Sequence, residues 1–192
     1  MIRKSSTTQK VIESAAARFL SEGFAAVSVD QIARAAGITK MTVYQHFRSK
    51  EDLLLQCLRW RLARRDVQLD ELVGDRSSGE CGVLQIFDWM ASNAEGGQFA
   101  GCAFLKATSE VGTSMPEVRE IAREAKRTMR ERLIKAVRKG GIAEPESLGS
   151  LCALLLEGAQ ALSLIERSSE PFHTARAQAL ALSAAHNPNR LA

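Results

Sequence analysis

A short stretch of the chain gathers side chains that can bind nucleic acid. They are Thr39, Lys40, Thr42, Tyr44, Gln45, His46 and Lys50. In a DNA groove, lysine can donate to guanine O6 and N7 or to phosphate, and glutamine can bind an adenine edge through two hydrogen bonds. Hydroxyl and imidazole groups can contact phosphate oxygens or bases. No carboxylate or cysteine lies at ligand spacing from His46, which disfavours a metal site.

Two short amphipathic segments position these side chains. Ser28 begins the sequence S-V-D-Q, which predicts a capped helix from about residue 28 to Gly37. Thr39 opens a second short helix, in which Val43 and Phe47 are four residues apart and face inward. A helix, a tight turn and a second helix form a helix-turn-helix, whose second helix can enter the major groove. The hydroxyl of Ser28 also lies at a helix N-terminus, which favours a phosphate.

The remaining sequence predicts an all-α fold of about nine helices and no strand. Apolar residues recur at helical spacing in each of the other segments. The predicted ranges are 8–22, 49–72, 83–91, 102–111, 116–139, 145–165 and a last helix from Pro171 or Thr174 to about 185. The polar residues 73–82 form the clearest break in this pattern. We assign residues 1–49 to a DNA-binding domain and 50–192 to a helical domain for ligand binding and dimerisation, connected by the helix from Lys50.

Composition and charge narrow the classes of protein. The chain has 192 residues, of which 45% are hydrophobic and 25% charged, as in an ordinary globular protein. Residues 1–65 carry 12 Lys and Arg against 5 Asp and Glu, which indicates a polyanionic partner. The start lacks the apolar core of a secretory signal, and no apolar run approaches the ~20 residues that span a bilayer. We therefore expect a cytoplasmic protein that does not bind membranes.

Catalytic and metal-binding motifs are missing from the sequence. It has no Gly-rich phosphate loop, no G-x-S-x-G and no H-E-x-x-H. The four cysteines, at positions 57, 81, 102 and 152, do not form C-x-x-C or a zinc pattern. We predict a protein that is not an enzyme and needs no metal or cofactor.

Residues 8–57 closely resemble the DNA-binding domain of the TetR (tetracycline-repressor-like) family of bacterial transcriptional regulators. The matching sequences are A-A-A-R-F-L-S-E-G-F (15–24), S-V-D-Q-I-A-R-A-A-G-I (28–38), T-V-Y-Q-H-F (42–47) and S-K-E-D-L-L (49–54). The rest of the chain fits the family's second domain only in length and helical class.

The resemblance implies a homodimer that binds a palindromic DNA operator and is released by a small molecule. By the same resemblance, Tyr44, His46 and Lys50 contact phosphates, Lys40 and Thr42 face bases, and Ser28 contacts the backbone. The family usually represses transcription, although the sequence leaves an activator open.

Candidate effector residues are apolar and flexible side chains that could line a cavity for a hydrophobic or aromatic molecule. They are Trp60, Phe87, Trp89, Met90, Phe99, Cys102, Phe104, Met115 and Met129. Ordinary core packing is the alternative for each of them. Cys102 begins a predicted helix, where a thiol becomes more reactive, so a regulator switched by thiol oxidation or electrophiles is the alternative function.

The dimer interface is predicted on the last two helices, which are rich in small residues that allow close helix packing. The candidate residues are Leu151, Leu155, Gly158, Ala159, Leu162, Ala177, Leu180, Ala181 and Ala184. Packing within one subunit is the alternative for these residues as well.

Overall fold

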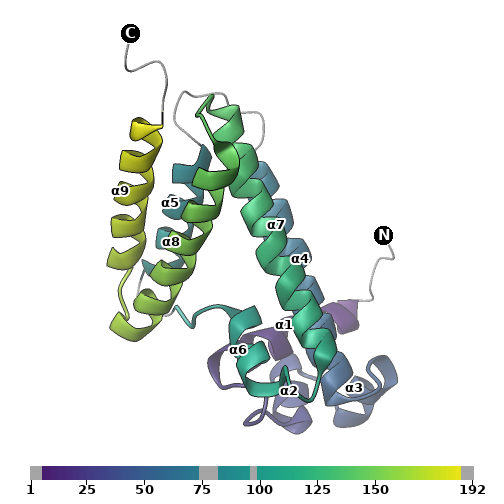
Figure 1. Ribbon diagram of the computed structural model, residues 1–192. Coiled ribbons are helices and arrows are strands. Elements are labelled where there is room, and N and C mark those ends of the chain that lie inside the picture. Colours follow the sequence, from purple (N-terminus) through teal and green to yellow (C-terminus); the bar gives the residue numbers. More distant parts are fainter. Residues whose placement is uncertain (1–5, 74–81, 96–98, 187–192) are drawn as a thin grey trace. The chain divides into compact units, whose positions relative to one another are not determined.

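The computed structural model describes residues 6–73, 82–95 and 99–186. Within these ranges the chain forms nine helices and no strand, which confirms the all-α prediction (Figure 1). The helices are α1 (Ser6–Ser21), α2 (Val29–Ala36), α3 (Lys40–His46), α4 (Lys50–Val73), α5 (Gly82–Ala94), α6 (Ala103–Val111), α7 (Pro116–Lys139), α8 (Pro145–Glu166) and α9 (Glu170–Ala185). Most of the predicted connection 73–82 lies outside the described residues.

Contacts between residues divide the chain into two units that are not continuous in sequence. The first unit combines residues up to Arg65 with Cys102–Ala125, and the second combines Asp66–Gly101 with residues from Lys126 onward. Helix α6 therefore belongs to the same unit as α1, α2 and α3, and α4 and α7 contribute to both units. The predicted division into a DNA-binding domain of residues 1–49 and a helical domain of residues 50–192 stays a prediction.

Local capping interactions fix the helices of the first unit. The Ser28 hydroxyl accepts a hydrogen bond from the Gln31 amide, and the Ser28 amide donates to Gln31 Oε1, which confirms the predicted capping box. Gly37 ends α2 in the left-handed conformation at φ 69°, where glycine carries no Cβ penalty. Ile12 and Ile32 are fully buried, and they join α1 and α2 in one hydrophobic core.

Helix α6 holds the connection between α1 and α2 through two charged side chains. Glu110 Oε2 accepts hydrogen bonds from the backbone amides of Phe24 (2.7 Å) and Ala25 (3.3 Å). Lys106 Nζ donates to the carbonyl oxygen of Leu20 at 2.7 Å, at the C-terminal end of α1. Because Lys106 and Glu110 are four residues apart, they lie on one face of α6. On this face Glu110 accepts hydrogen bonds from the amides that follow α1, and Lys106 donates one to a carbonyl of the last turn of α1.

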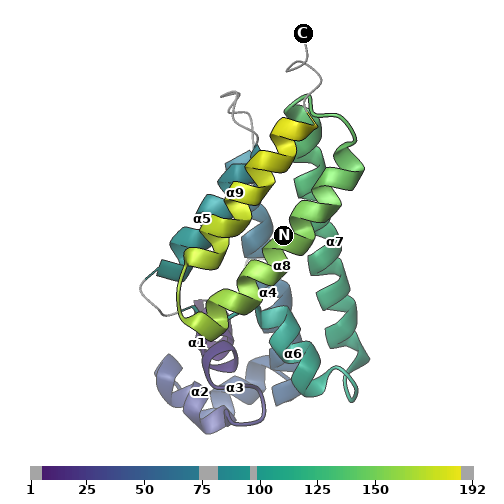
Figure 2. The ribbon, with the colours of Figure 1, turned by 60° about the vertical axis from the view of Figure 1, so that its left-hand side comes forward.

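The second unit is built around α5, α8 and α9. Helix α9 packs against both α5 and α8, as Figure 2 shows. Phe87, Leu156 and Phe172 are fully buried in this core. Gly149 of α8 lies so close to Ile134 of α7 that an added Cβ would be 2.7 Å from the Ile134 Cα atom. The lack of a side chain at Gly149 thus permits a close contact between these helices.

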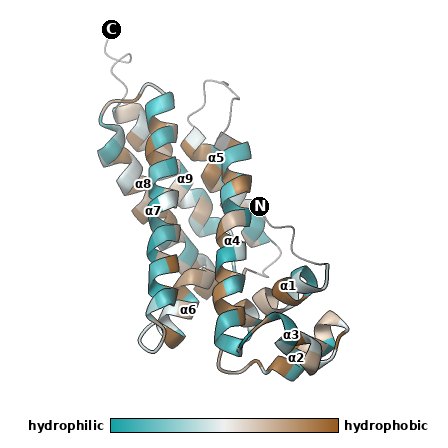
Figure 3. Ribbon diagram, turned by 90° about the vertical axis from the view of Figure 1, so that its right-hand side faces the viewer, coloured by the Kyte–Doolittle hydropathy of each residue, from teal (hydrophilic) through white to brown (hydrophobic). Residues whose placement is uncertain are grey.

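Hydrophilic residues predominate along α7 in Figure 3, whereas α8 is much more apolar. Helix α8 is long and apolar enough to cross a membrane by length and composition, although no such run was expected from the sequence. A core helix of a soluble protein passes the same test, and α8 packs against α9. The length of α8 is therefore weak support for a membrane segment.

Candidate nucleic-acid interface

The buried face of α3 attaches this short helix to the first unit. The exposed fractions of Val43 and Phe47 are each 1%, as the sequence predicted. Thr39 caps the helix by accepting a hydrogen bond from the Thr42 amide at 3.1 Å. The hydroxyls of Thr39 and Thr42 also bond each other at 2.9 Å. A helix held at its first turn and along one side presents its other side in a fixed orientation.

The opposite side of α3 is open to solvent. Of the predicted DNA-binding residues, Ser28, Thr39, Lys40, Tyr44, Gln45 and His46 are exposed, and Thr42 and Lys50 are partly buried. Hydroxyl, amide, imidazole and ammonium groups thus share one accessible surface. These groups can bind both phosphate oxygens and base edges.

An ion pair joins the first turns of α2 and α3. Lys40 Nζ lies 2.8 Å from Asp30 Oδ2, and about half of each side chain is exposed. The hydrogen bond and the negative charge of Asp30 raise the pKa of Lys40 above its ordinary value, so this ammonium stays charged. In the sequence, Asp30 is only one residue of the S-V-D-Q pattern that starts a helix.

Two other predicted contacts have partners that are distant in sequence. His46 Nδ1 lies 3.1 Å from the Thr8 hydroxyl. If the hydroxyl donates, the ring proton is on Nε2, which can then donate to a phosphate. The Lys50 ammonium lies 4.3 Å from the centre of the Phe24 ring, where the aromatic face attracts a cation without cancelling its charge. No spacing in the sequence signals these partners.

The structure divides the predicted effector residues between two hydrophobic cores. Four of them, Trp60, Cys102, Phe104 and Met115, belong to the core of the first unit. The other five, Phe87, Trp89, Met90, Phe99 and Met129, belong to the core of the second unit. Within the second group, the rings of Phe99 and Phe172 meet edge to face at 5.6 Å. The effector role of these nine residues stays a prediction.

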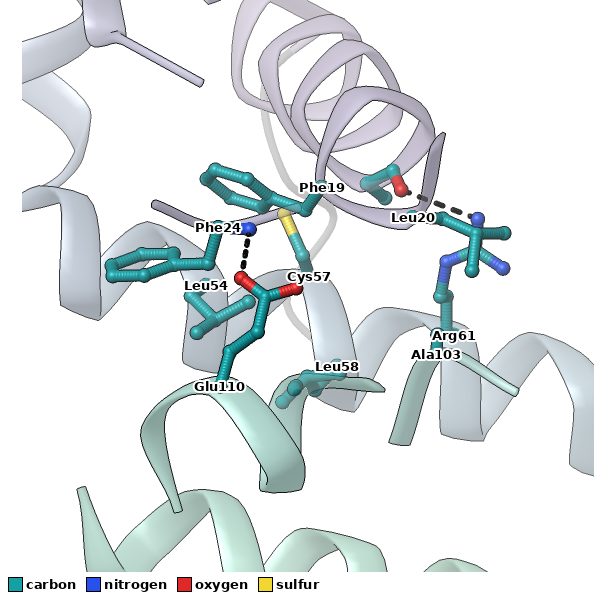
Figure 4. A pocket seen from close by; sticks show the side chains of 11 residues that line it. Phe19, Leu20, Phe24, Leu54, Cys57, Leu58, Arg61, Ala103 and Glu110 are labelled. Atoms are coloured by element: carbon teal, nitrogen blue, oxygen red, sulfur yellow. Dashed lines mark hydrogen bonds between the residues drawn. The ribbon is translucent and has the colours of Figure 1, made fainter. Parts of the chain in front are cut away.

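A small cavity of about 20 Å³ lies among α1, α4 and α6, within the first unit (Figure 4). Its lining is mostly apolar, and the charged residues that line it are Arg61 and Glu110. The Arg61 guanidinium donates to the carbonyl oxygen of Ala16 at 3.3 Å, and burial lowers its pKa below the ordinary value. Such a volume holds about one water molecule. None of the nine predicted effector residues lines this cavity.

Most residues predicted for the dimer interface are accessible in the single chain. Leu151, Gly158, Leu162, Ala177, Leu180 and Ala181 are exposed, and Leu155 and Ala184 are partly buried. Ala159 is only 3% exposed and packs in the core of its own unit. Two apolar residues of α8 that were not predicted for the interface, Leu154 and Ile165, are also accessible, with exposed fractions of 69% and 76%.

Two sequence families match the chain, one in each part. Residues 11–57 match "Bacterial regulatory proteins, tetR family", and residues 82–178 match "Transcriptional regulator LmrA/YxaF-like, C-terminal domain". The chain belongs to the TetR family of bacterial transcriptional regulators. This TetR-family chain is accordingly a DNA-binding regulator whose helix-turn-helix is formed by α2 and α3.

Individual relatives support the same assignment. The transcriptional regulator SrpR of Pseudomonas putida is 30% identical over 55% of this chain and 49% of its own length. The Tn10 TetC protein of Escherichia coli is 34% identical over 43% of this chain and 42% of its length. The matches thus span less than half of these two relatives. TtgW, an uncharacterised HTH-type regulator of Pseudomonas putida, is 30% identical over 78% of its length and 55% of this chain.

Solved structures share the fold over nearly the whole chain. E. coli NemR in its reduced form has a TM-score of 0.80 at 22% identity, and covers 90% of this chain and 94% of its own. SCO4454 of Streptomyces coelicolor has a TM-score of 0.81 at 23% identity, and covers 92% of this chain and 95% of its own. At these identities the similarity shows the nine-helix fold and does not identify an operator or an effector.

Proposed function

We propose that this TetR-family regulator is a cytoplasmic repressor that binds a palindromic operator as a homodimer. The observation that carries the proposal is the two-sided character of α3, which buries Val43 and exposes Tyr44, Gln45 and His46. In a helix-turn-helix, the exposed side of the second helix contacts bases and the flanking groups bind phosphates. A dimer then requires two half-sites spaced by about 34–36 Å or a multiple of that distance.

The exposed leucines of α8 and α9 support dimerisation through these helices. Leu154, Leu162 and Leu180 are between 49% and 69% exposed. Exposed apolar side chains of this size on neighbouring helices are typical of an interface. The proposed interface comprises the predicted residues except Ala159, which is already buried within one chain.

An effector that releases the DNA is proposed to be small and hydrophobic or aromatic. The support is the apolar, partly exposed Trp89 and Phe99 at the edge of the second core. Such a molecule would act only through a higher affinity for the conformation that does not fit the operator. Compounds that bind there should quench the fluorescence of Trp89 and release operator DNA.

A second candidate is a thiol-switched regulator that uses Cys102. This thiol is partly exposed and lies at the N-cap position of α6, where its side chain makes no capping hydrogen bond. The neighbour NemR was solved in a form described as reduced, which provides a comparison for a thiol switch. If Cys102 is the sensor, Cys102→Ser should bind the operator normally but resist release by an electrophile. Release of wild type and variant alike would refute this candidate.

The central experiment is selection of bound genomic fragments by the purified, reduced protein at two salt concentrations. We expect enrichment of one palindromic sequence, with weaker binding at the higher salt. Absence of any enriched sequence from the reduced protein without ligand would refute the proposed operator binding.

Dimerisation is tested separately by sedimentation equilibrium. Leu154→Glu should dissociate the dimer because it places a charge in an apolar interface. Leu105→Glu is the matched control, because Leu105 is 55% exposed but lies on α6. A wild-type monomer, or equal dissociation by both variants, would refute the α8–α9 interface.

A further inference from the structure

We propose that Asp30 is a specificity-determining residue, which acts by pairing with Lys40 so that the two side chains together select a G·C base pair in each half-site. This inference rests on the proposed operator binding by α3. It goes further because it assigns a role to a carboxylate on α2 and a base pair to a particular ion pair.

The ion pair lies at the N-terminal end of α3. Lys40 is the first residue of α3, and Asp30 lies in the first turn of α2. The residues at the start of a recognition helix are those that meet base edges. Since both side chains are about half exposed and lie 2.8 Å apart, DNA at this surface would encounter them together.

Asp30 is available for this pairing because other groups cap α2. The Ser28 hydroxyl accepts from the Gln31 amide, and the Gln31 side chain returns a hydrogen bond to the Ser28 amide. The carboxylate of Asp30 instead reaches across to the neighbouring helix. The capping of α2 therefore does not account for the contact between Asp30 and Lys40.

A paired lysine and an unpaired lysine interact differently with DNA. An unpaired ammonium is attracted to phosphates in any sequence. A carboxylate 2.8 Å away largely cancels that attraction at longer range, and the pair then behaves as a dipole. Direct hydrogen bonds remain available, because an ammonium has three N–H donors and Asp30 occupies one. Pairing thus reduces binding to phosphate while preserving donors for a base.

The free N–H donors of Lys40 and the carboxylate of Asp30 match the major-groove edge of a G·C pair. Guanine presents the acceptors O6 and N7, to which lysine donates, and cytosine presents an N4 amino group, from which aspartate accepts. An ammonium beside a carboxylate provides this donor and acceptor in one unit. Lys50 provides a contrast within the same unit, because its ammonium lies over the Phe24 ring and keeps its attraction for phosphate.

The test compares wild type with Asp30→Asn, Asp30→Glu and Lys40→Met. The matched control is Glu22→Gln, which removes one charge from an exposed ion pair with Arg18 at the end of α1. Each protein is used to select operator sites and is then titrated with the best wild-type operator and a scrambled duplex at several salt concentrations. Melting by circular dichroism checks that each variant is folded.

For Asp30→Asn we expect tighter binding to the scrambled duplex by severalfold. The salt slope should grow by about 0.9 for each phosphate contact that the released lysine gains. Preference for guanine at the position that depends on Lys40 should fall by at least about fivefold, the lower end of what one base contact contributes. Asp30→Glu should retain the preference, and Lys40→Met should lose it.

The proposal is overturned if Asp30→Asn has the same salt slope and the same ratio of operator to scrambled affinity as wild type. It is also overturned if Glu22→Gln changes that ratio equally, because the effect would then be one of net charge. A lower melting temperature with an unchanged ratio would restrict Asp30 to stabilising α2. If wild type selects no site at all, the proposed operator binding fails instead.

Discussion

Removing the carboxylate of Glu110 should destabilise the first unit, because α6 then loses its hydrogen bonds to the α1–α2 connection. The carboxylate accepts from the amides of Phe24 at 2.7 Å and Ala25 at 3.3 Å. A hydrogen bond to a charged group contributes about 1.5–3 kcal/mol when it is shielded from water. Because this side chain is exposed and the second bond is long, we expect a loss of about 1–2 kcal/mol in the free energy of unfolding for Glu110→Ala.

The chain contains two tryptophans, one in each unit, and this permits a direct assay. Replacing Trp89 with Phe leaves Trp60 as a fluorescent reporter of the first unit. In that background, urea unfolding of Glu110→Ala should show a lower midpoint and an unchanged m-value. Glu110→Gln should fall between wild type and Glu110→Ala, since its amide oxygen still accepts a hydrogen bond.

The control is Glu124→Gln, which neutralises an exposed carboxylate of α7 in the same unit. A surface substitution of this kind changes stability by less than about 0.5 kcal/mol. If Glu110→Ala shifts the midpoint no more than this control does, then α6 does not hold the connection through Glu110, and the reasoning is refuted.

Three further predictions concern DNA binding, packing and pH. Tyr44→Ala should weaken operator binding by about fivefold in fluorescence anisotropy, the effect of losing one hydrogen bond, without changing the melting temperature; unchanged affinity would argue against α3 as the recognition helix. Gly149→Ala should lower the free energy of unfolding by about 1–3 kcal/mol because its Cβ would collide with Ile134, whereas a stabilised variant would show that the helices are farther apart. Hydrogen bonds from the backbone amide of Glu51 and from Ser49 lower the pKa of the Glu51 carboxylate in the folded protein. The carboxylate therefore stabilises the fold fully above its ordinary pKa of 4.5, and this stabilisation is lost as the pH falls through the lower folded-state pKa. Urea unfolding of Glu51→Gln should therefore match wild type in acid and differ at neutral pH, and a difference that persists in acid would contradict this cause.

The sequence predicted most helix boundaries because the signals that set them are local. Ser28, Gly37 and Thr39 define the ends of α2 and α3 through hydrogen bonds within a few residues. Pro116 starts α7 as expected, since proline suits the first turn of a helix. The inward positions of Val43 and Phe47 follow from helical periodicity in the same way.

Contacts between distant residues were not predictable from spacing. The bonds from Thr8 to His46 and from Glu110 to Phe24 join residues 38 and 86 positions apart. An apolar pattern in the sequence predicts that a side chain is buried, but it does not show in which core the side chain packs. The sequence alone therefore does not show that Phe104 packs in the first unit and Phe87 in the second.

The discontinuous first unit has a consequence for the order of folding during synthesis. The amides after α1 and the carbonyls at its end meet their partners on α6 only after the chain has been extended by more than 80 residues. Until then the first 65 residues can form α1, α2 and α3, but the hydrophobic core that they share with Phe104 and Ala107 of α6 stays incomplete. Contacts this distant in sequence are slow to form because the intervening loop must close. A ribosome-bound chain should therefore complete its first unit late, and a fragment cut after residue 65 would lack α6.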